Sequence, residues 1–344
     1  MTDSEQSKLI ISGAAAPSGV PDEAQEEGDT TGEMELRQVT VPPESHGGRL
    51  DRTLAVIVPE FSRTYLQHLI ESGMVKLGDL AVTKTSTKVK VGDELAIELR
   101  PTPQSQAFKP EAMALDIVFE DAYLMVINKP AGLVVHPAPG NWSGTLLNGL
   151  LAHDPQAVFL PRAGIVHRLD KDTSGLMVVA RQRTVMDQLV CLIAARDVSR
   201  EYVALVHGAW QGAKTRQVDA PIGRDPRNRL RMAVVDLEKN AGKTASTVVS
   251  LLQTAGKHCL VKCKLHTGRT HQIRVHMAFL GHPLVSDELY GGAPAAGLVR
   301  QGLHACRLAF EHPVTGEAME FKSGLPDDLQ AAVAGLGLIY NEIQ

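Results

Sequence analysis

Aromatic residues are scarce in this chain of 344 residues, where Phe, Tyr and Trp together make up 4%. A hydrophobic core must therefore consist mainly of Val, Leu, Ile and Ala, and a hydrophobic content of 44% supplies enough of them. No stretch reaches 18 consecutive apolar residues, which excludes a conventional membrane-spanning helix. The N-terminus lacks the basic and then apolar pattern of a secretory signal, so we expect a cytoplasmic protein without membrane contact.

Cysteine is scarce as well, and the few cysteines are too widely spaced for a disulfide framework. They are Cys191, Cys259, Cys263 and Cys306. The chain has no Cys-x-x-Cys pair and no His-x-x-x-His pair. His266, His271 and His276 recur at intervals of five, which suits neither one face of a helix nor one face of a strand. We therefore expect no structural or catalytic metal.

Positive charge is nearly absent from the first 35 residues, which hold nine acidic residues against the single Lys8. The formal net charge of -4 is therefore unevenly distributed, and the remaining chain carries 34 basic and 30 acidic side chains. A mildly basic body is compatible with RNA binding but does not require it. The first residues also lack periodicity and are rich in Gly, Ala, Ser and Thr, so we predict a disordered acidic tail over residues 1–46.

Residues 47–106 have the pattern of a compact unit with two helices and short strands. Apolar residues at helical spacing predict one helix that ends at Pro59 and a second that begins with Ser62 as its N-cap. Short alternating segments follow, and we expect strands at 74–77, 81–82, 87–91 and 94–99. The polar, proline-containing segment 101–106 predicts a linker.

Residues 107–344 are rich in strand patterns, with a few helices between them. Strands are predicted at 115–121, 123–129, 176–181, 202–207, 247–252 and 259–266. Helices are predicted around 184–196 and from Gln272 to a stop at Gly281, and an exposed loop or hairpin over 223–244. Because strands and helices do not alternate as βαβ units, we expect an α+β fold with a mixed, mostly antiparallel sheet.

A dense group of polar residues lies ahead of the apolar strand that begins at Leu176. These residues are His167, Arg168, Asp170, Lys171, Asp172, Thr173 and Ser174. Charged side chains beside a core strand must be paired if they are buried, so the group is either an ion-paired surface loop or a functional site. By residue type Asp170 could act as a base, a nucleophile or a metal ligand, and its neighbours do not decide among these roles.

Three further segments contain residues that are common in active sites. The segment Asn128–Pro137 ends a strand and continues into a Pro-Gly loop that contains His136. Tyr202 begins a strand, where a single tyrosine usually belongs to the core. A segment rich in arginine and histidine follows later, and within it His271 and Arg274 lie three positions apart, on one face of the expected helix.

Taken in this order, the segments resemble the RluA-type pseudouridine synthases. The shared motifs are Lys-Pro-x-Gly-Leu-x-Val-His, His-Arg-Leu-Asp-x-x-Thr-Ser-Gly-Leu, Arg-x-Tyr and Gly-Arg-Thr-His-Gln-Ile-Arg-x-His. The resemblance spans roughly residues 47–325, and the loop 135–141 is similar to that of the RluD-like branch, whose members modify large-subunit (23S) ribosomal RNA. It implies a catalytic domain over residues 107–344 that isomerises uridine in RNA and needs no cofactor.

The resemblance also implies roles for individual residues. Asp170 would be the essential catalytic aspartate, acting as nucleophile or as base, and Arg274 would pair with its carboxylate. Tyr202 would stack on the flipped uracil, and its hydroxyl would help to remove the proton from ring carbon 5. Arg168 would fill the gap that the flipped base leaves in the RNA, while Leu169 would serve packing.

Residues 47–106 resemble the S-four type RNA-binding domain, a small α/β module. This resemblance implies that Arg49, Arg52, Arg63 and Lys76 present a cationic face to RNA phosphates. By their spacing alone, these four residues are more typical of ordinary solvated charges on amphipathic helices, and the functional interpretation depends on the motifs that follow in the chain.

We therefore expect a monomeric enzyme whose partner is 23S ribosomal RNA or the assembling large ribosomal subunit. Two alternatives stay open. The same chemistry could act on transfer RNA or at another ribosomal site, because the short stretch after Tyr290 leaves the target in doubt. The chain could also be a non-catalytic RNA-binding factor for ribosome assembly, but the presence of Asp170, Tyr202 and Arg274 speaks against an idle site.

Overall fold

The computed structural model describes residues 35–341 apart from residues 60, 62, 100–106, 139 and 229. The chain divides into two compact units, one that ends at Pro101 and one that begins at Thr102. The predicted linker 101–106 lies outside the described residues. Within the described residues, no helix has both the length and the apolar character needed to cross a bilayer.

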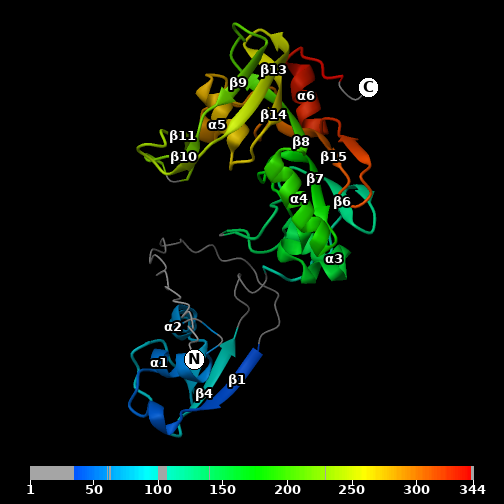
Figure 1. Cartoon of the computed structure of the whole chain (residues 1–344). Coiled ribbons are helices and arrows are strands. Elements are labelled where there is room, and N and C mark those ends of the chain that lie inside the picture. The colour runs from blue at the N-terminus through cyan, green and yellow to red at the C-terminus, as the bar shows by residue number, and fades with distance from the viewer. Residues whose placement is uncertain are drawn as a thin grey trace, which may run out of the picture. The chain divides into compact units, whose positions relative to one another are not determined.

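The N-terminal unit is a four-stranded antiparallel sheet in the order β1-β4-β2-β3, with two helices packed against it (Figure 1). Its elements are β1 (Glu35–Thr40), η1 (Pro43–Ser45), α1 (Leu50–Ile57), α2 (Arg63–Glu71), β2 (Val75–Leu77), β3 (Leu80–Ala81) and β4 (Glu94–Leu99). Leu50 and Leu54 of α1 and Leu66 and Ile70 of α2 are fully buried. Both helices thus form on the apolar spacing from which they are predicted.

The structure differs from the prediction for this unit at two places. Residues 35–40 lie within the predicted disordered tail, but they form β1, which pairs with β4 along its whole length. The strand was missed because it is a half-exposed edge strand with polar residues and no apolar alternation. The expected strand 87–91 is absent from the described strands, and Lys88 makes only an isolated bridge with Arg49. The predicted N-cap Ser62 and residues 1–34 lie outside the described part of the chain.

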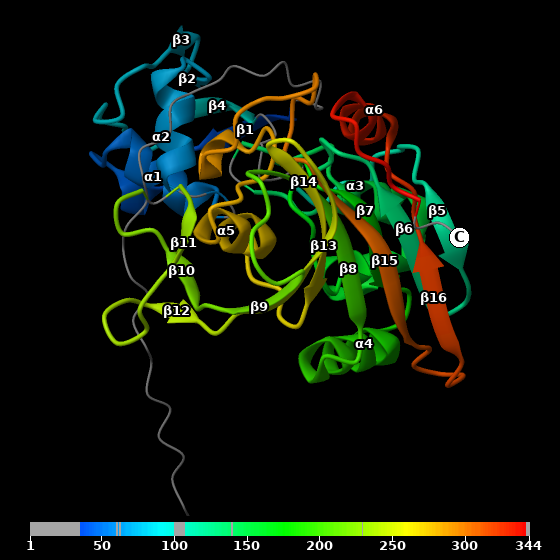
Figure 2. The same ribbon diagram turned by 90° about the horizontal axis from the view of Figure 1, so that it is seen from above.

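The C-terminal unit is built on a nine-stranded sheet in the order β5-β6-β7-β15-β8-β14-β13-β9, with β16 paired to β15 (Figure 2). Its strands are β5 (Ile117–Glu120), β6 (Leu124–Lys129), β7 (Ser174–Ala180), β8 (Ser199–His207), β9 (Thr215–Asp219), β13 (Ser246–Ala255), β14 (His258–Leu265), β15 (Leu303–Glu311) and β16 (Ala318–Lys322). Neighbouring strands run antiparallel except for β7 and β15, which run parallel. The predicted mixed, mostly antiparallel α+β fold is confirmed.

The parallel pair requires a glycine at its meeting point. Gly175 has a φ of +116°, and a Cβ atom on it would lie 2.3 Å from the carbonyl oxygen of Ala305 on β15. The backbones of the two strands can approach each other this closely only because no side chain lies between them.

Helices cover both faces of the sheet. Successive strand residues point to opposite sides, so one strand contributes apolar side chains to the core on each face. The helices are α3 (Leu146–His153), α4 (Arg183–Ala195), α5 (Gln272–Phe279) and α6 (Asp327–Gly335). Tyr202 and Ala204 on β8 belong to the core that contains α3 and α5. Val203 and Leu205 alternate with them and pack in the core that contains α6. The face with α3 and α5 is therefore the one towards which Tyr202 points.

Shorter elements complete this unit. They are η3 (Pro155–Phe159), η4 (Pro161–Gly164), β10 (Ile222–Arg224), β11 (Met232–Val234), β12 (Gly242–Lys243) and η5 (Glu288–Tyr290). The strands β10, β11 and β12 form a small separate sheet where an exposed loop or hairpin is predicted. The predicted helices are α4 and α5, and α5 ends before Gly281 as expected.

Candidate active site

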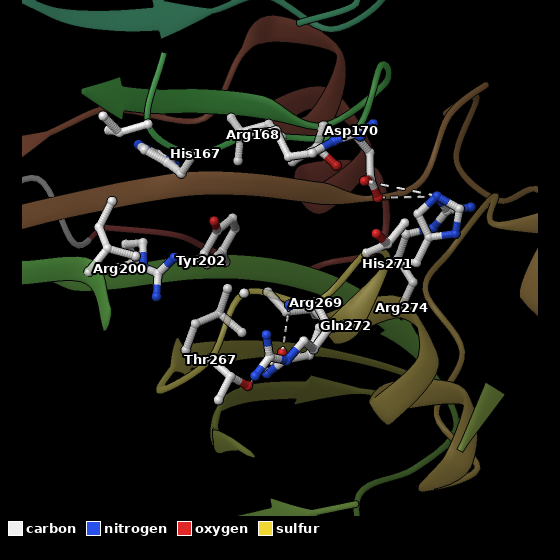
Figure 3. A pocket seen from close by; sticks show the side chains of 18 of the residues that line it. His167, Arg168, Asp170, Arg200, Tyr202, Thr267, Arg269, His271, Gln272 and Arg274 are labelled. Carbon is white, nitrogen blue, oxygen red and sulfur yellow. Dashed lines mark hydrogen bonds and ion pairs between the residues drawn. The ribbon is translucent and has the colours of Figure 1, made fainter. Parts of the chain in front are cut away.

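A pocket of about 790 Å³ opens on the sheet face that carries α3 and α5 (Figure 3). Its walls come from the loop 165–173 ahead of β7, the end of α4, the start of β8 and the segment 265–274. His136, from the loop after β6, also lines it. Each of the four motifs from the sequence thus contributes to one cavity, whose volume is typical of a small-ligand site.

Two carboxylates hold the guanidinium of Arg274 in the pocket wall. Asp170 Oδ2 accepts a hydrogen bond from Arg274 Nη1 at 3.2 Å. Asp287 accepts two more, from Nε at 2.7 Å and from Nη2 at 2.8 Å. Burial alone would lower the pKa of Arg274, but the hydrogen bonds and charges of Asp287 and Asp170 outweigh it and raise this pKa. Arg274 is therefore a fixed cation, as expected for a partner of Asp170.

His271 lies beside the same aspartate, at the start of α5. Its Nε2 is 3.9 Å from Asp170 Oδ1, and its Nδ1 is 2.8 Å from the hydroxyl of Tyr290. That hydroxyl accepts a hydrogen bond from the backbone N–H of Met232, so its own proton is free to point at Nδ1. Burial lowers the pKa of His271 although Asp170 opposes this. A neutral ring with its proton on Nε2 is thus directed towards Asp170.

A buried glutamine fixes the turn that precedes α5. Gln272 Oε1 accepts hydrogen bonds from the hydroxyl of Thr267 at 2.7 Å and from the N–H of Arg269 at 3.0 Å. Its Nε2 donates to the carbonyl of Ser246 at 3.0 Å and to the hydroxyl of Thr247 at 2.8 Å. The motif around Gln272 is therefore a frame that ties the turn to β13 and positions the pocket arginine on the following helix.

Tyr202 lines the pocket from β8, and in the view of Figure 3 it lies between Arg200 and Asp170. Its side chain is buried, and burial raises the pKa of Tyr202 to about 12 although the charge of Arg200 opposes this. The hydroxyl therefore stays protonated at neutral pH. A phenol in this state can donate a hydrogen bond or stack on a base, but it is a poor acceptor of a carbon-bound proton.

A buried lysine fastens the loop that carries Asp170. Lys129 ends β6 with no exposed surface, and its Nζ donates to three backbone carbonyls. These belong to Pro130 at 2.7 Å, Leu133 at 2.8 Å and Lys171 at 2.9 Å. Because Lys171 directly follows Asp170, the ammonium group holds the loop that carries Asp170 against the loop after β6.

The residues that precede Asp170 occupy three different environments. His167 Nε2 accepts a hydrogen bond from the N–H of Val178 at 3.1 Å, so this ring nitrogen carries no proton. Burial, helped by the charge of Arg200, lowers the pKa of His167 to about 3. Arg168 is exposed and lines the pocket, whereas Leu169 is buried in the core. Packing by Leu169 is confirmed.

The chain is similar to known proteins over the segments that form this pocket. Residues 123–279 match the family model described as RNA pseudouridylate synthase. Over 313 residues, the chain is 47% identical to ribosomal large subunit pseudouridine synthase D of Neisseria meningitidis serogroup A, across 87% of this chain and 82% of that protein. The chain belongs to the RluA family of pseudouridine synthases.

Further relatives agree with this assignment. The protein of the same name from Pseudomonas aeruginosa is 45% identical over 309 residues, across 86% of this synthase and 94% of the relative. The solved structure of human RNA pseudouridylate synthase domain containing 1 has a TM-score of 0.50 and 27% identity, and it covers 63% of this synthase and 86% of that chain. The human protein with domain containing 4 in its name matches in fold, with a TM-score of 0.51 and 24% identity across 65% of this synthase and 94% of that chain.

Asp287 is a member of the synthase's site that the sequence does not predict. Its side chain is 1% exposed and makes the two shortest hydrogen bonds to Arg274. No signal marked it, since it lies 13 positions after the arginine in a loop outside the quoted motifs. Lys129 and Gln272 lie within those motifs, but their bonds to backbone groups far along the chain have no counterpart in sequence spacing.

The cations predicted in the N-terminal unit of the synthase fall into two groups. Arg49 Nε and Arg63 Nη2 donate to the carboxylate of Asp51, at 3.0 and 2.6 Å, and Asp51 is fully buried. Burial would raise the pKa of Asp51, but the hydrogen bonds from these arginines lower it well below its usual range. Arg52 and Lys76, in contrast, are exposed. The structure thus joins Arg49 and Arg63, whose side chains are partly exposed, to one buried carboxylate, and this ion-pair cluster does not include the other two.

His276 of the synthase is held by hydrogen bonds within the protein. His276 Nδ1 and Nε2 lie 2.9 Å from the hydroxyl of Thr247 and the carbonyl of Ala220. In the part of the chain that the structure describes, no three His, Cys, Asp or Glu side chains are grouped to hold a metal.

Proposed function

We propose that this synthase converts specific uridines of large-subunit (23S) ribosomal RNA to pseudouridine. The observation that carries the proposal is Asp170 in the pocket, held by Arg274 and close to Tyr202. The ribosomal target is supported by relatives that are 42–47% identical and are named ribosomal large subunit pseudouridine synthase D.

The reaction rearranges one nucleotide without loss of atoms. The bond between N1 of uracil and C1′ of ribose breaks, the ring turns, and C5 forms a new bond to C1′. The proton leaves C5 and N1 gains one. Asp170 acts on this nucleotide as nucleophile or base, and Arg274 holds its carboxylate in place. Neither role requires a metal or a redox cofactor.

The target base must leave the RNA stack to reach the pocket. Tyr202 offers a buried aromatic face to the extruded uracil, and its protonated hydroxyl can donate to a ring carbonyl. Arg168 is exposed beside the pocket, where it takes the place of the extruded base. Extrusion costs a few kcal/mol, which such contacts offset.

The N-terminal unit is proposed to be the RNA-binding domain of S-four type, and the chain to work as a monomer on free RNA or on the assembling subunit. Exposed Arg52 and Lys76 are available to phosphates. Arg49 and Arg63 reach RNA only if they keep Asp51 paired at the same time, because a lone buried carboxylate is costly.

The test uses large-subunit RNA from cells that lack the protein and are complemented with wild type, Asp170→Asn or Asp172→Asn. Asp172 lies on the same loop and its carbonyl, unchanged by the substitution, accepts from Arg300, so this variant is a matched control. Pseudouridines are mapped by carbodiimide treatment and primer extension. Each pseudouridine appears as a stop in primer extension. We expect stops that disappear in cells without the protein, return with wild type and with Asp172→Asn, and stay absent with Asp170→Asn. Restoration by Asp170→Asn contradicts the catalytic role, and no dependent stop redirects the search to transfer RNA or to a binding factor.

A further inference from the structure

Arg200 is a buried cation in the pocket that the catalytic constellation does not use. It lies two positions before Tyr202 on β8, so both side chains point to the same face of the sheet. Its exposed fraction is 6%, and it lines the pocket together with Asp170 and Arg274. In the view of Figure 3 it lies across Tyr202 from the Asp170–Arg274 pair.

This guanidinium lacks a counter-charge among the described residues. Its Nε is a buried polar side-chain atom without a hydrogen-bond partner, and no ion pair joins Arg200 to a described carboxylate. Arg274 in the same pocket is bound by two carboxylates, and Arg300 nearby is bound by Asp328 at 2.6 Å. An unpaired buried charge is unfavourable, so Arg200 needs a partner that arrives from outside.

The residues around Arg200 leave space for its guanidinium, but none of those that line the pocket offers it a free carboxylate. A Cβ on Gly268 would lie 3.0 Å from Arg200 Nη1, so the glycine allows the side chain to lie against the turn before α5. His167, which also lines the pocket, accepts a hydrogen bond at Nε2 from the N–H of Val178, and burial keeps its ring neutral. Asp170, the carboxylate among the residues that line the pocket, is engaged with Arg274.

We propose that Arg200 binds a backbone phosphate next to the target uridine. The proposal rests on the proposed function only in that the ligand is RNA. The carbonyl oxygens of uracil are neutral and would leave the arginine's charge uncompensated, whereas each phosphate diester carries one negative charge. Guanidinium donors match phosphate oxygens in geometry, and the pocket is large enough for a nucleotide together with its phosphate.

This role predicts opposite effects on stability and on binding. Arg200→Met keeps the length of the side chain and removes an uncompensated charge, so the Tm of the free protein stays the same or rises. Its affinity for RNA falls about 10- to 100-fold, the loss expected for a hydrogen bond to a charged group. If Arg200 instead serves only to support the turn before α5, Arg200→Met lowers the Tm.

The experiment measures binding of an RNA stem-loop that contains the mapped uridine, with Asp170→Asn in every protein so that no turnover occurs. Neutral methylphosphonate linkages replace the phosphates on the 5′ and 3′ sides of the uridine one at a time. We expect one of the modified RNAs to bind the protein that keeps Arg200 weakly, with the affinity that unmodified RNA has for Arg200→Met. The affinity of Arg200→Met should not change with that linkage. The slope of log affinity against log salt should fall by about 0.7, the value for one phosphate contact of a single strand. Arg200→Lys should restore that slope.

Arg183→Met is the matched control, because Arg183 is an exposed arginine at the start of α4 outside the pocket. It should leave affinity and slope unchanged. The proposal is overturned if Arg200→Met responds to each methylphosphonate as strongly as the Arg200 protein, or if its Tm falls while its RNA affinity is kept. A failure of the ribosomal assignment is seen separately, in the pseudouridine map, and the binding test is then repeated on the RNA that the map identifies.

Discussion

Replacement of Asp287 by Asn tests whether the second carboxylate on Arg274 is needed for both stability and catalysis. Asp287 is 1% exposed and accepts from Nε and Nη2 of Arg274, whereas Asp170 accepts from Nη1 alone. The amide offers one acceptor in place of two, has no charge, and places its NH₂ group against a guanidinium that can only donate.

The expected loss of stability follows from these contacts. A hydrogen bond to a charged group contributes about 1.5–3 kcal/mol, and removal of one partner of a buried ion pair costs about 3–5 kcal/mol. Because Asp170 remains as a second partner, we expect the free energy of unfolding to fall by about 3 kcal/mol. A displaced Arg274 also positions Asp170 less well, and errors of about 1 Å cost up to about 100-fold in rate, so kcat should fall about 10- to 100-fold.

Urea unfolding measures the first quantity. The second is measured as tritium released to water from RNA labelled at C5 of uridine, since this hydrogen leaves in the reaction. Glu288→Gln is the control, because it removes the same charge from an exposed residue next to Asp287. If both variants show the same stability and the same kcat, the buried carboxylate does not position Arg274 and the reasoning is refuted.

Three further predictions follow from buried and exposed charges. The pKa of His167 is about 3 when folded and near 6.5 when unfolded, so the unfolded chain binds more protons below pH 6.5 and stability falls as pH drops. His167→Gln should remove up to about 1.4 kcal/mol per pH unit of this slope in urea titrations at pH 4–6.5. Tyr202→Phe should keep the shape of the kcat/KM profile from pH 6 to 9, because the hydroxyl does not ionise there. Arg63→Gln should lower the Tm of the N-terminal unit, because the buried carboxylate of Asp51 loses one of its charged partners. Lys76→Gln should only lower the slope of log RNA affinity against log salt, by about 0.7.

Each of these predictions has a result that contradicts it. An unchanged pH slope in His167→Gln would mean that the histidine is protonated in the folded state. Loss of an ionisation near neutral pH in Tyr202→Phe would make the phenol the base that removes the C5 proton. If Arg63→Gln and Lys76→Gln weaken RNA binding equally without a change of Tm, the Asp51 cluster is a phosphate site after all.

Most helices and strands of the fold could be predicted from local patterns of apolar residues in the sequence. The helix α5 was predictable because its apolar positions repeat at helical spacing before Gly281, and β6, β7 and β8 because each is a continuous apolar run. The edge strand β1 was not, since an edge strand with one paired side needs no apolar pattern. The order of strands within the sheet also has no local signal.

The candidate site was predictable only where one motif holds all the needed residues. Asp170 stood out because six polar neighbours cluster around it ahead of a core strand. Asp287 could not be found, because its role depends on a loop folding back onto α5. The ion pairs of the N-terminal unit had no local signal either, since Asp51 binds Arg49 and Arg63 only when α1 and α2 pack side by side.

The parallel pair of β7 and β15 also sets an order of events during synthesis on the ribosome. Ser174 and His304 hydrogen-bond across this pair at 3.0 Å, although they lie 130 positions apart. At roughly 5–20 residues per second, the later strand emerges about 7–26 s after the earlier one. Until then the edge of β7 is open to wrong partners, and Asp170 lies on a loop without the strand that joins it to Tyr202. A nascent chain therefore lacks a complete active site until β15 joins β7 to β8.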